Sequence, residues 1–318
     1  MTPTTYGRDF AYCLKSHGGV RGFNASLWRF LLRCTLFCHS VATFLTSVSS
    51  YEGGCGFEDK CKLENSKSYQ SLLQNNEETI FVYDNSPISQ EVHGENIVYI
   101  HDSQNGGLSV AYNKAAQYAR CNRFDWLLLL DQDTTFQKGA IEYYIKAINE
   151  FPDIKMFAPV HQISDGRYIS PTHYVCKGSR PSRVMKCGLL NFKEASPINS
   201  GIMVNVTAFY EAGCYDEEVV LDFSDIRFME KFRKLYPTFY TIKEIICLQD
   251  FSIEERNADK LMIRYKVFLR CALACKREHL RDCFSYFFVT VKRTIHLVWQ
   301  THSLSFIKVY ITNYVLRK

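Results

Sequence analysis

Two aspartates, Asp131 and Asp133, stand one residue apart at the end of the stretch WLLLLDQDTTF, residues 126–136. Four consecutive leucines are typical of a strand buried on both faces of a parallel sheet. Because side chains alternate along a strand, both carboxylates can point the same way, where they repel each other unless a cation lies between them. Such a pair suits Mg²⁺, which keeps several waters and accepts phosphate oxygens. The alternative is an ordinary turn.

Polar clusters follow two further strand-like segments. Asp84-Asn85-Ser86 ends TIFVYDNS, and His101-Asp102-Ser103 ends NIVYIHDS. In open parallel sheets, ligands bind beyond the carboxyl ends of the strands. We therefore expect these clusters to share an edge with Asp131 and Asp133, which favours the metal and phosphate interpretation over the turn.

The elements around these clusters alternate between strands and helices. Helices are predicted over 107–121 and near 138–150, and strands at TIFVYDNS, NIVYIHDS, WLLLLD and IKMFAPVHQ. This alternation predicts an α/β fold with a mostly parallel sheet flanked by helices. Further on, we predict a turn into a strand in SPINSGIMVNV, a helix in DFSDIRFMEKFRKLY and a strand in TFYTIKEIICLQDF.

Charge divides the 318-residue chain unevenly. Residues 256–318 hold 13 Lys+Arg against 3 Asp+Glu, whereas the rest of the chain has a net charge of −5. We therefore divide the chain into an atypical N-terminal segment (1–60), an α/β domain (61–255) and a basic, aromatic-rich helical tail (256–318). A basic amphipathic tail predicts peripheral contact with an anionic membrane, and the alternative is a helical layer covering the sheet. No nucleic-acid module accompanies the charge, so no nucleic-acid partner is expected.

The most apolar segment of the N-terminal part is LWRFLLRCTLFCHSVATFLTSV, residues 27–48. Two arginines and a histidine interrupt it, so we predict a buried or interfacial helix, with a membrane anchor or a secretory signal as the alternatives. The 13 cysteines contain no CxxC pair, which favours a reducing compartment over a disulfide framework.

Four ordered motifs resemble the family 2 glycosyltransferases, in particular their bacterial rhamnosyltransferase-like branch. They are VYDNSP (82–87), NGGLSVAYNKA (105–115), LLLLDQDT (127–134) and INSGIMVNVTAFYEAGCYDE (198–217), and the resemblance covers Leu63 to Ser252. It implies a GT-A fold and an inverting transfer of sugar from a nucleotide diphosphate sugar to an acceptor hydroxyl, with Mg²⁺ or Mn²⁺. The implied setting is bacterial polysaccharide or glycolipid assembly on a saccharide or lipid-linked acceptor, in the cytoplasm or peripherally on the inner membrane.

The resemblance also implies roles for single residues. Asp133 matches the ligand of the metal that bridges the two phosphates, and Asp131 matches a residue near the ribose and the cation. The residues that match donor-binding positions are Asp84, which contacts the nucleoside, Asn85 and Ser86 in the same turn, Asn105, Gly106 and Gly107 in the turn before the helix, and Asn113 on that helix. Small residues at 105–107 would let the donor approach the backbone, although a plain turn explains them equally well.

The stretch LDFSDIRF, residues 221–228, resembles the acceptor-side motif of the same family. Asp225 then matches the general base, which takes the proton of the acceptor hydroxyl as that hydroxyl attacks the anomeric carbon. Asp222 is the second candidate for this role. The alternative for both aspartates is capping of the helix N-terminus.

Three departures from the family pattern leave rival interpretations open. No segment of residues 1–60 plainly replaces the family's first strand, Arg227-Phe228 stands where the motif has Glu-Trp, and CLQDFS offers Gln249 or Asp250 where relatives have a histidine. The arginine would pair with a phosphate or lower the pKa of a neighbouring carboxylate. The rivals are a nucleotidyltransferase on the same type of sheet and a degenerate, non-catalytic, membrane-associated relative.

Overall fold

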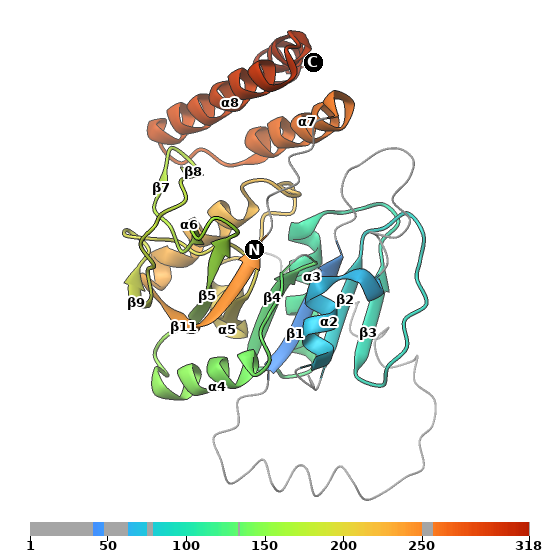
Figure 1. The fold of residues 1–318 in the computed structure, drawn as a ribbon, viewed down its shortest axis with the longest axis vertical. Helices are drawn as coiled ribbons and strands as arrows, with labels where there is room; N and C mark the ends of the chain where they lie inside the picture. The colour runs from blue at the N-terminus through green and yellow to red at the C-terminus, as the bar shows by residue number, and fades with distance from the viewer. Residues whose placement is uncertain (1–40, 48–62, 75–78, 133, 250–256, 318) are drawn as a thin grey trace, which may run out of the picture. The chain divides into compact units, whose positions relative to one another are not determined.

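A computed structural model describes residues 41–47, 63–74, 79–132, 134–249 and 257–317 (Figure 1). The strands are β1 (Val41–Ser47), β2 (Ile80–Asp84), β3 (Ile97–His101), β4 (Trp126–Asp131), β5 (Met156–Ile163), β6 (Tyr168–Ser170), β7 (Tyr174–Val175), β8 (Gly178–Ser179), β9 (Gly188–Asn191), β10 (Ile202–Asn205) and β11 (Thr238–Gln249). The helices are η2 (Leu63–Asn65), α2 (Lys67–Gln74), α3 (Leu108–Cys121), α4 (Ala140–Glu150), α5 (Val206–Glu211), α6 (Ser224–Leu235), α7 (Ala258–Ala274), α8 (Leu280–Thr301), α9 (Ser305–Val309) and η3 (Tyr310–Val315).

The central sheet has the strand order β3-β2-β1-β4-β10-β5-β11-β9, with β6 paired to β5 (Figure 1). Strands β3, β2, β1 and β4 are parallel to one another, as are β5 and β11. Strand β10 is antiparallel to both neighbours, β4 and β5, and β9 is antiparallel to β11. The mostly parallel α/β sheet predicted from the sequence is thus confirmed.

Strand β1 (Val41–Ser47) pairs in parallel with β2 on one side and with β4 on the other. The prediction of a helix over 27–48 is therefore wrong for 41–47, and residues 27–40 lie outside the described part of the chain. A central strand of a parallel sheet is apolar throughout, so a short apolar run fits a buried strand as well as a buried helix. The first strand of the family pattern is present, and the sheet begins within the segment 1–60.

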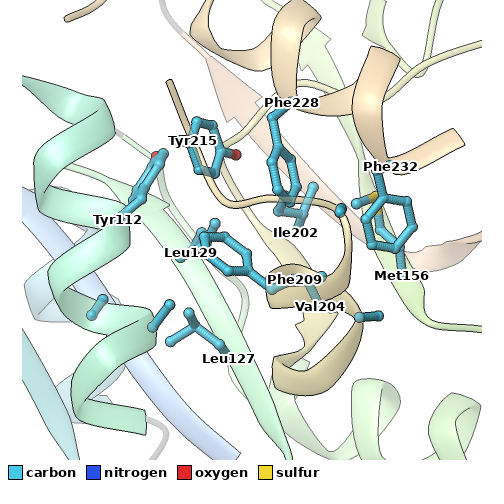
Figure 2. Packing of buried hydrophobic residues seen from close by; sticks show 14 of the residues in the cluster. Tyr112, Leu127, Leu129, Met156, Ile202, Val204, Phe209, Tyr215, Phe228 and Phe232 are labelled. Carbon is cyan, nitrogen blue, oxygen red and sulfur yellow. The ribbon is translucent and has the colours of Figure 1, made fainter. Parts of the chain in front are cut away.

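The run of four leucines packs both faces of the sheet. Leu127 and Leu129 belong to a core with α3, α5 and α6, whereas Leu128 and Leu130 belong to a second core with α2 and α4. All four side chains are almost completely buried, and Figure 2 shows the first face. Because alternate side chains point to opposite faces, both faces of β4 are covered by packed side chains. Asp131 is therefore the last residue of a strand that is buried on both sides.

The C-terminal tail is helical, as predicted. Helices α7 and α8 pack on the segment that leads into α6: Phe223 meets Tyr286 of α8 edge to face, with ring centroids 5.4 Å apart. Among the helices that the structure describes, none is long and apolar enough to cross a bilayer.

Candidate active site

The carboxyl ends of β1, β2 and β4 lie side by side at one edge of the sheet. Thr46 of β1 is in register with Asp131, and Ser47 is in register with Asp84. After β1, the chain adds β2 and β3 on one side of β1 and then β4 on its other side. The strand order therefore reverses at β1, and open α/β sheets bind ligands at such a topological switch point. The sequence prediction that Asp84 and Asp131 share an edge is confirmed.

Tyr112 of α3 orients the Asp131 carboxylate. Its hydroxyl donates to Asp131 Oδ1 at 2.6 Å, and the phenol ring is fully buried. Burial, together with the negative charge of Asp131, raises the pKa of Tyr112 far above its usual value, so the hydroxyl remains a donor. The carboxylate is thereby held in one orientation at the sheet edge.

A cluster of hydroxyl groups fixes the backbone on either side of Asp133, which itself lies outside the described residues. Ser68 Oγ contacts the Asp131 carbonyl and lies 2.7 Å from the Thr134 carbonyl, and it accepts from Thr134 N at 3.1 Å. Ser200 Oγ accepts from Asp131 N at 3.2 Å and contacts the Thr134 hydroxyl. Helix α2 and the residues just before β10 thus both hold the chain at Asp131 and Thr134.

Asp225 lies in the first turn of α6 and remains partly accessible. Burial raises the pKa of Asp225 to about 6, and the charge of Asp222 acts in the same direction. One oxygen, Oδ1, accepts from Ile226 N at 2.7 Å. A carboxylate with this basicity is ionised at neutral pH and well matched to receiving a proton.

Two adjacent phenols lie between Asp131 and Asp225. The rings of Tyr112 and Tyr215 are neighbours in Figure 2, with centroids 5.1 Å apart and ring planes tilted by 55°. Burial, followed by the charges of both carboxylates, raises the pKa of each phenol. The Tyr215 hydroxyl donates to Asn199 Oδ1 at 2.7 Å, and Asn199 Nδ2 donates to the hydroxyl of Ser224, next to Asp225, at 3.4 Å. The two aspartates therefore belong to one site.

Asp222 precedes α6 and has a partner of its own. The Arg264 guanidinium of α7 bonds both of its oxygens, with Nη2 donating to Oδ1 at 3.0 Å. Phe223 is the N-cap residue of α6 and its side chain forms no capping bond, whereas Asp225 accepts from the free N–H of Ile226 within the first turn. This pairing favours Asp225 over Asp222 as the proton acceptor.

Arg227, a departure from the family motif, is buried within a group of carboxylates. It lies 3.1 Å from Glu230, 3.5 Å from Asp216 and 3.8 Å from Glu278. These contacts tie α6 to the segments before it and after α7. The guanidinium is therefore engaged with protein carboxylates and not directed at a phosphate.

The turn Asp84–Ser86 is buried and internally bonded. Asp84 accepts from Ser86 N at 2.8 Å, from Gln90 Nε2 at 2.9 Å and from the Tyr99 hydroxyl at 2.6 Å. Asn85 is 1% exposed. These bonds fix the course of the chain at the end of β2, beside the edge that carries Asp131.

The turn before α3 is shaped by a contact with the segment that leads to Asp225. Gly107 has a φ of 89°, and a Cβ there would lie 2.5 Å from the carbonyl oxygen of Val220. Leu108 N donates to the same carbonyl at 2.7 Å, while Asn105, with a φ of 51°, and Gly106 complete the turn. Gly107 is therefore required by a close approach of protein backbone, whereas the sequence left open both an approach of the donor and a plain turn.

Asn113 joins α3 to the same part of the chain. Its amide donates to the Tyr215 carbonyl at 3.1 Å and to Glu217 Oε1 at 2.9 Å, and its Oδ1 accepts from Tyr215 N at 2.9 Å. Tyr112, Tyr215 and Asn199 were not predicted as site residues, although all three lie inside the motifs that carried the resemblance.

Comparison with known proteins gives one family match. Residues 66–212 match the family model described as glycosyl transferase family 2. The match supports a family 2 glycosyltransferase domain in this part of the chain, which is called the glycosyltransferase domain below. No curated protein matches the sequence.

The glycosyltransferase domain has a GT-A fold, shared with solved glycosyltransferases of low sequence identity. GalNAc-T7, solved with UDP, GalNAc and Mn²⁺, is similar with a TM-score of 0.50 and 10% identity, over 87% of this chain and 58% of that one. Mannosyltransferase PcManGT from Pyrobaculum calidifontis, in complex with GDP-Man and Mn²⁺, has a TM-score of 0.45 and 9% identity over 92% and 86%. S. aureus TarS 1-349 has a TM-score of 0.45 and 11% identity over 81% and 72%. The present chain thus spans 58% of the length of the GalNAc-T7 chain.

The carboxylate of Asp131 is a type of ligand that suits a divalent cation. Among the described residues, no group of three or more His, Cys, Asp or Glu side chains is arranged to hold a metal. Such a cage is not needed for Mg²⁺, which proteins bind through one or two carboxylates together with water and substrate phosphates. Asp131 offers an oriented carboxylate at the ligand edge. Asp133, Asp250 and the side chain of Gln249 lie outside the described residues.

Proposed function

We propose that the protein is an inverting, metal-dependent glycosyltransferase that moves a sugar from a nucleotide diphosphate sugar to an acceptor hydroxyl. One observation carries the proposal: Asp131 at the ligand edge of the sheet and Asp225 at the start of α6 are joined through Tyr112, Tyr215 and Asn199. A carboxylate for the donor side and a carboxylate for the acceptor side thus lie in one site, in a domain of this family.

Asp225 takes the proton of the acceptor hydroxyl as its oxygen attacks the anomeric carbon. Attack from the face opposite the leaving diphosphate inverts the configuration in a single displacement. Asp131 and Asp133 would hold Mg²⁺ or Mn²⁺, and the cation, when bound, stabilises charge on the departing diphosphate. The pKa of Asp225, raised to about 6, supports its role as the base.

We assign donor binding to the two turns that flank the edge of the sheet. Asp84–Ser86 and Asn105–Gly107 follow β2 and β3, which end at the same edge of the sheet as β1 and β4. Asn113 holds α3 against the segment of Tyr215. In this assignment the turns shape the surface on which the nucleoside lies. The rhamnosyltransferase-like branch and a role in bacterial polysaccharide or glycolipid assembly complete the proposal.

Peripheral contact with an anionic membrane follows from one face of α8. Phe284, Phe288, Ile295 and Trp299 are 58–74% exposed, and their spacing places them on one side of the helix. Asp282, the one acidic residue of α8, is paired with Lys177, whereas Lys292 is exposed. Large exposed apolar faces mark interaction sites, and aromatic residues beside basic ones suit the surface of an anionic bilayer.

Calorimetric titration with UDP, GDP and dTDP, with and without Mn²⁺, tests the transferase assignment. We expect one of these nucleotides to bind, more weakly after chelation of the metal, and Asp131→Asn to weaken that binding. Asp125→Asn, at the opposite end of β4, is the matched control and should bind normally. A folded sample that binds none of the three would favour the non-catalytic relative.

Flotation with vesicles of phosphatidylglycerol and phosphatidylcholine tests the membrane contact. Truncation within α8 is unsuitable because Tyr286 and Leu297 are fully buried. The double variant Phe288→Gln/Trp299→Gln should lose vesicle binding. Ile88→Gln/Val184→Gln replaces equally exposed apolar residues of the glycosyltransferase domain and should retain it. Equal binding by both variants would refute the assignment.

A further inference from the structure

A cavity of about 230 Å³ lies between α6, the hairpin of β7 and β8, and the first turn of α8. Tyr174 and Ile226 form part of its wall. Ile226 directly follows Asp225, and the charge of Asp225, after burial, raises the pKa of Tyr174. The cavity therefore adjoins the proposed base, where we expect an acceptor to bind.

The wall of this cavity is basic. Residues 166–193 contain six Lys and Arg residues and no Asp or Glu, although the chain before residue 256 is acidic overall. Lys177 and Lys193 of this segment line the cavity together with His173 and Arg233. A concave site with several cationic side chains is suited to a small anionic group, above all a phosphate.

Of the cationic side chains that line the cavity, Lys177 is ion-paired within the protein, whereas Lys193 and Arg233 can bind an anion. Lys177 contacts both carboxylates that line the cavity: Asp282 at 3.2 Å, and Glu230 at hydrogen-bond distance. Lys193 and Arg233 are exposed, and within the part of the chain that the structure describes they form no ion pair. The positive charge that remains after internal pairing is thus concentrated on these two residues.

We infer that the acceptor substrate carries a phosphate group, which Lys193 and Arg233 bind in this cavity while Asp225 receives the proton of the acceptor hydroxyl. The inference rests on the proposed function and adds the chemical class of the acceptor. The phosphate belongs either to a soluble phosphorylated saccharide or to a lipid-linked one. Ser285 of α8 also lines the cavity, and Phe284 beside it is 73% exposed, which offers an apolar surface to a lipid chain next to the phosphate.

Cys176 provides a direct reporter, because its thiol is free and exposed and it lines the cavity. The full chain is alkylated with iodoacetamide, and the rate at each cysteine is followed by peptide mass spectrometry. Cys121, also free and exposed but outside the cavity, is the internal control. The probes are inorganic phosphate, phenyl phosphate, farnesyl phosphate and neutral farnesol, all at the same ionic strength.

We expect at least one phosphate compound to slow alkylation of Cys176 about fivefold or more at saturation, with Cys121 unaffected and farnesol without effect. Protection by all three phosphates supports a soluble acceptor, and protection by farnesyl phosphate alone supports a lipid-linked one. Lys193→Gln/Arg233→Gln should abolish protection. Arg180→Gln/Arg183→Gln, in the same basic segment but outside the cavity wall, should preserve it.

Three results would overturn the inference: equal protection by farnesol, unchanged protection in Lys193→Gln/Arg233→Gln, or no protection by any phosphate. Nucleotide binding measured on the same samples separates this failure from that of the proposed function. A protein that binds a nucleotide but shows no protection of Cys176 would remain a glycosyltransferase with an uncharged acceptor.

Discussion

The Tyr112 hydroxyl donates to Asp131 Oδ1 at 2.6 Å, and the ring of Tyr112 lies against the ring of Tyr215. The hydroxyl of Tyr112 thus orients Asp131, the proposed donor-side carboxylate. The ring of Tyr112 packs against Tyr215, which is bonded through Asn199 to Ser224, next to Asp225. Side chains that orient metal ligands are commonly worth 10-fold to 100-fold in affinity. The relationship makes Tyr112 a positioning residue whose effect can be measured.

Tyr112→Phe should weaken Mn²⁺-dependent nucleotide binding by about 10-fold or more, because the Asp131 carboxylate loses its orienting donor. Calorimetric titration of the nucleotide at several Mn²⁺ concentrations measures this effect. Tyr144→Phe is the control, since Tyr144 is equally buried and its hydroxyl donates to the Gly201 carbonyl. Equal losses of nucleotide binding in both variants would show that the effect reports general destabilisation.

Asp225→Asn should lower kcat by at least about 10²-fold while leaving nucleotide binding intact, because the amide cannot accept the proton. In the unmodified protein the rate of transfer should rise as the pH increases through about 6, where Asp225 is half ionised, and level off about one pH unit higher. A pH–rate profile measured with excess donor checks both statements. A rate that is constant from pH 5 to pH 8 would argue for another base.

The same substitution should stabilise the fold at neutral pH. The pKa of Asp225 is raised from 3.8 to about 6, so its ionised form is disfavoured in the folded state. This destabilisation is absent below about pH 4 and complete above about pH 6. Discounted for the partial exposure of Asp225, it amounts to about 1–2 kcal/mol. Thermal unfolding of Asp225→Asn should therefore show a Tm higher by a few degrees at pH 8 and no gain at pH 4.

Gly107→Ala should destabilise the protein by about 2–4 kcal/mol, because it combines a left-handed backbone with a clash against Val220. Gly213→Ala is a matched control, since Gly213 has a φ of 85° and open space around its Cβ position. Its loss of about 1 kcal/mol measures the backbone contribution alone. Urea unfolding measures the free energy of unfolding of both variants, and the difference between their losses reports the clash with Val220. Equal losses in the two variants would contradict the close approach of Val220 to Gly107.

The sequence predicted the elements whose signal is local. The buried run before Asp131 was identified as a strand because Leu, flanked by turn residues, fits a doubly covered strand, and β2, β3, α3, α4, α6 and β11 were identified by their periodicity. Strand β1 was mistaken for a helix because a short apolar run fits either element. The short strands β6 to β9 were not predicted, since their pairing depends on partners far away in the sequence.

The site could be predicted only in part, for a related reason. Asp84 and Asp131 were placed at one edge because parallel strands end together. The need for a glycine at position 107 could not be predicted from the sequence, because Val220, which lies against it, is more than 100 residues away along the chain. The Arg264 partner of Asp222 comes from α7, outside the segment that resembles the family. Both contacts join segments that are distant in the sequence, and neither composition nor residue spacing predicts such contacts.

The bonds from the start of α3 to residues 219 and 220 have a mechanical consequence. Leu108 N and the Ser109 hydroxyl hold these two carbonyls at 2.7 Å and 2.6 Å, only a few residues before Asp225. These bonds tie the turn before α3 to the segment that leads into α6, so we expect the donor side and the base side of the proposed site to move as one piece.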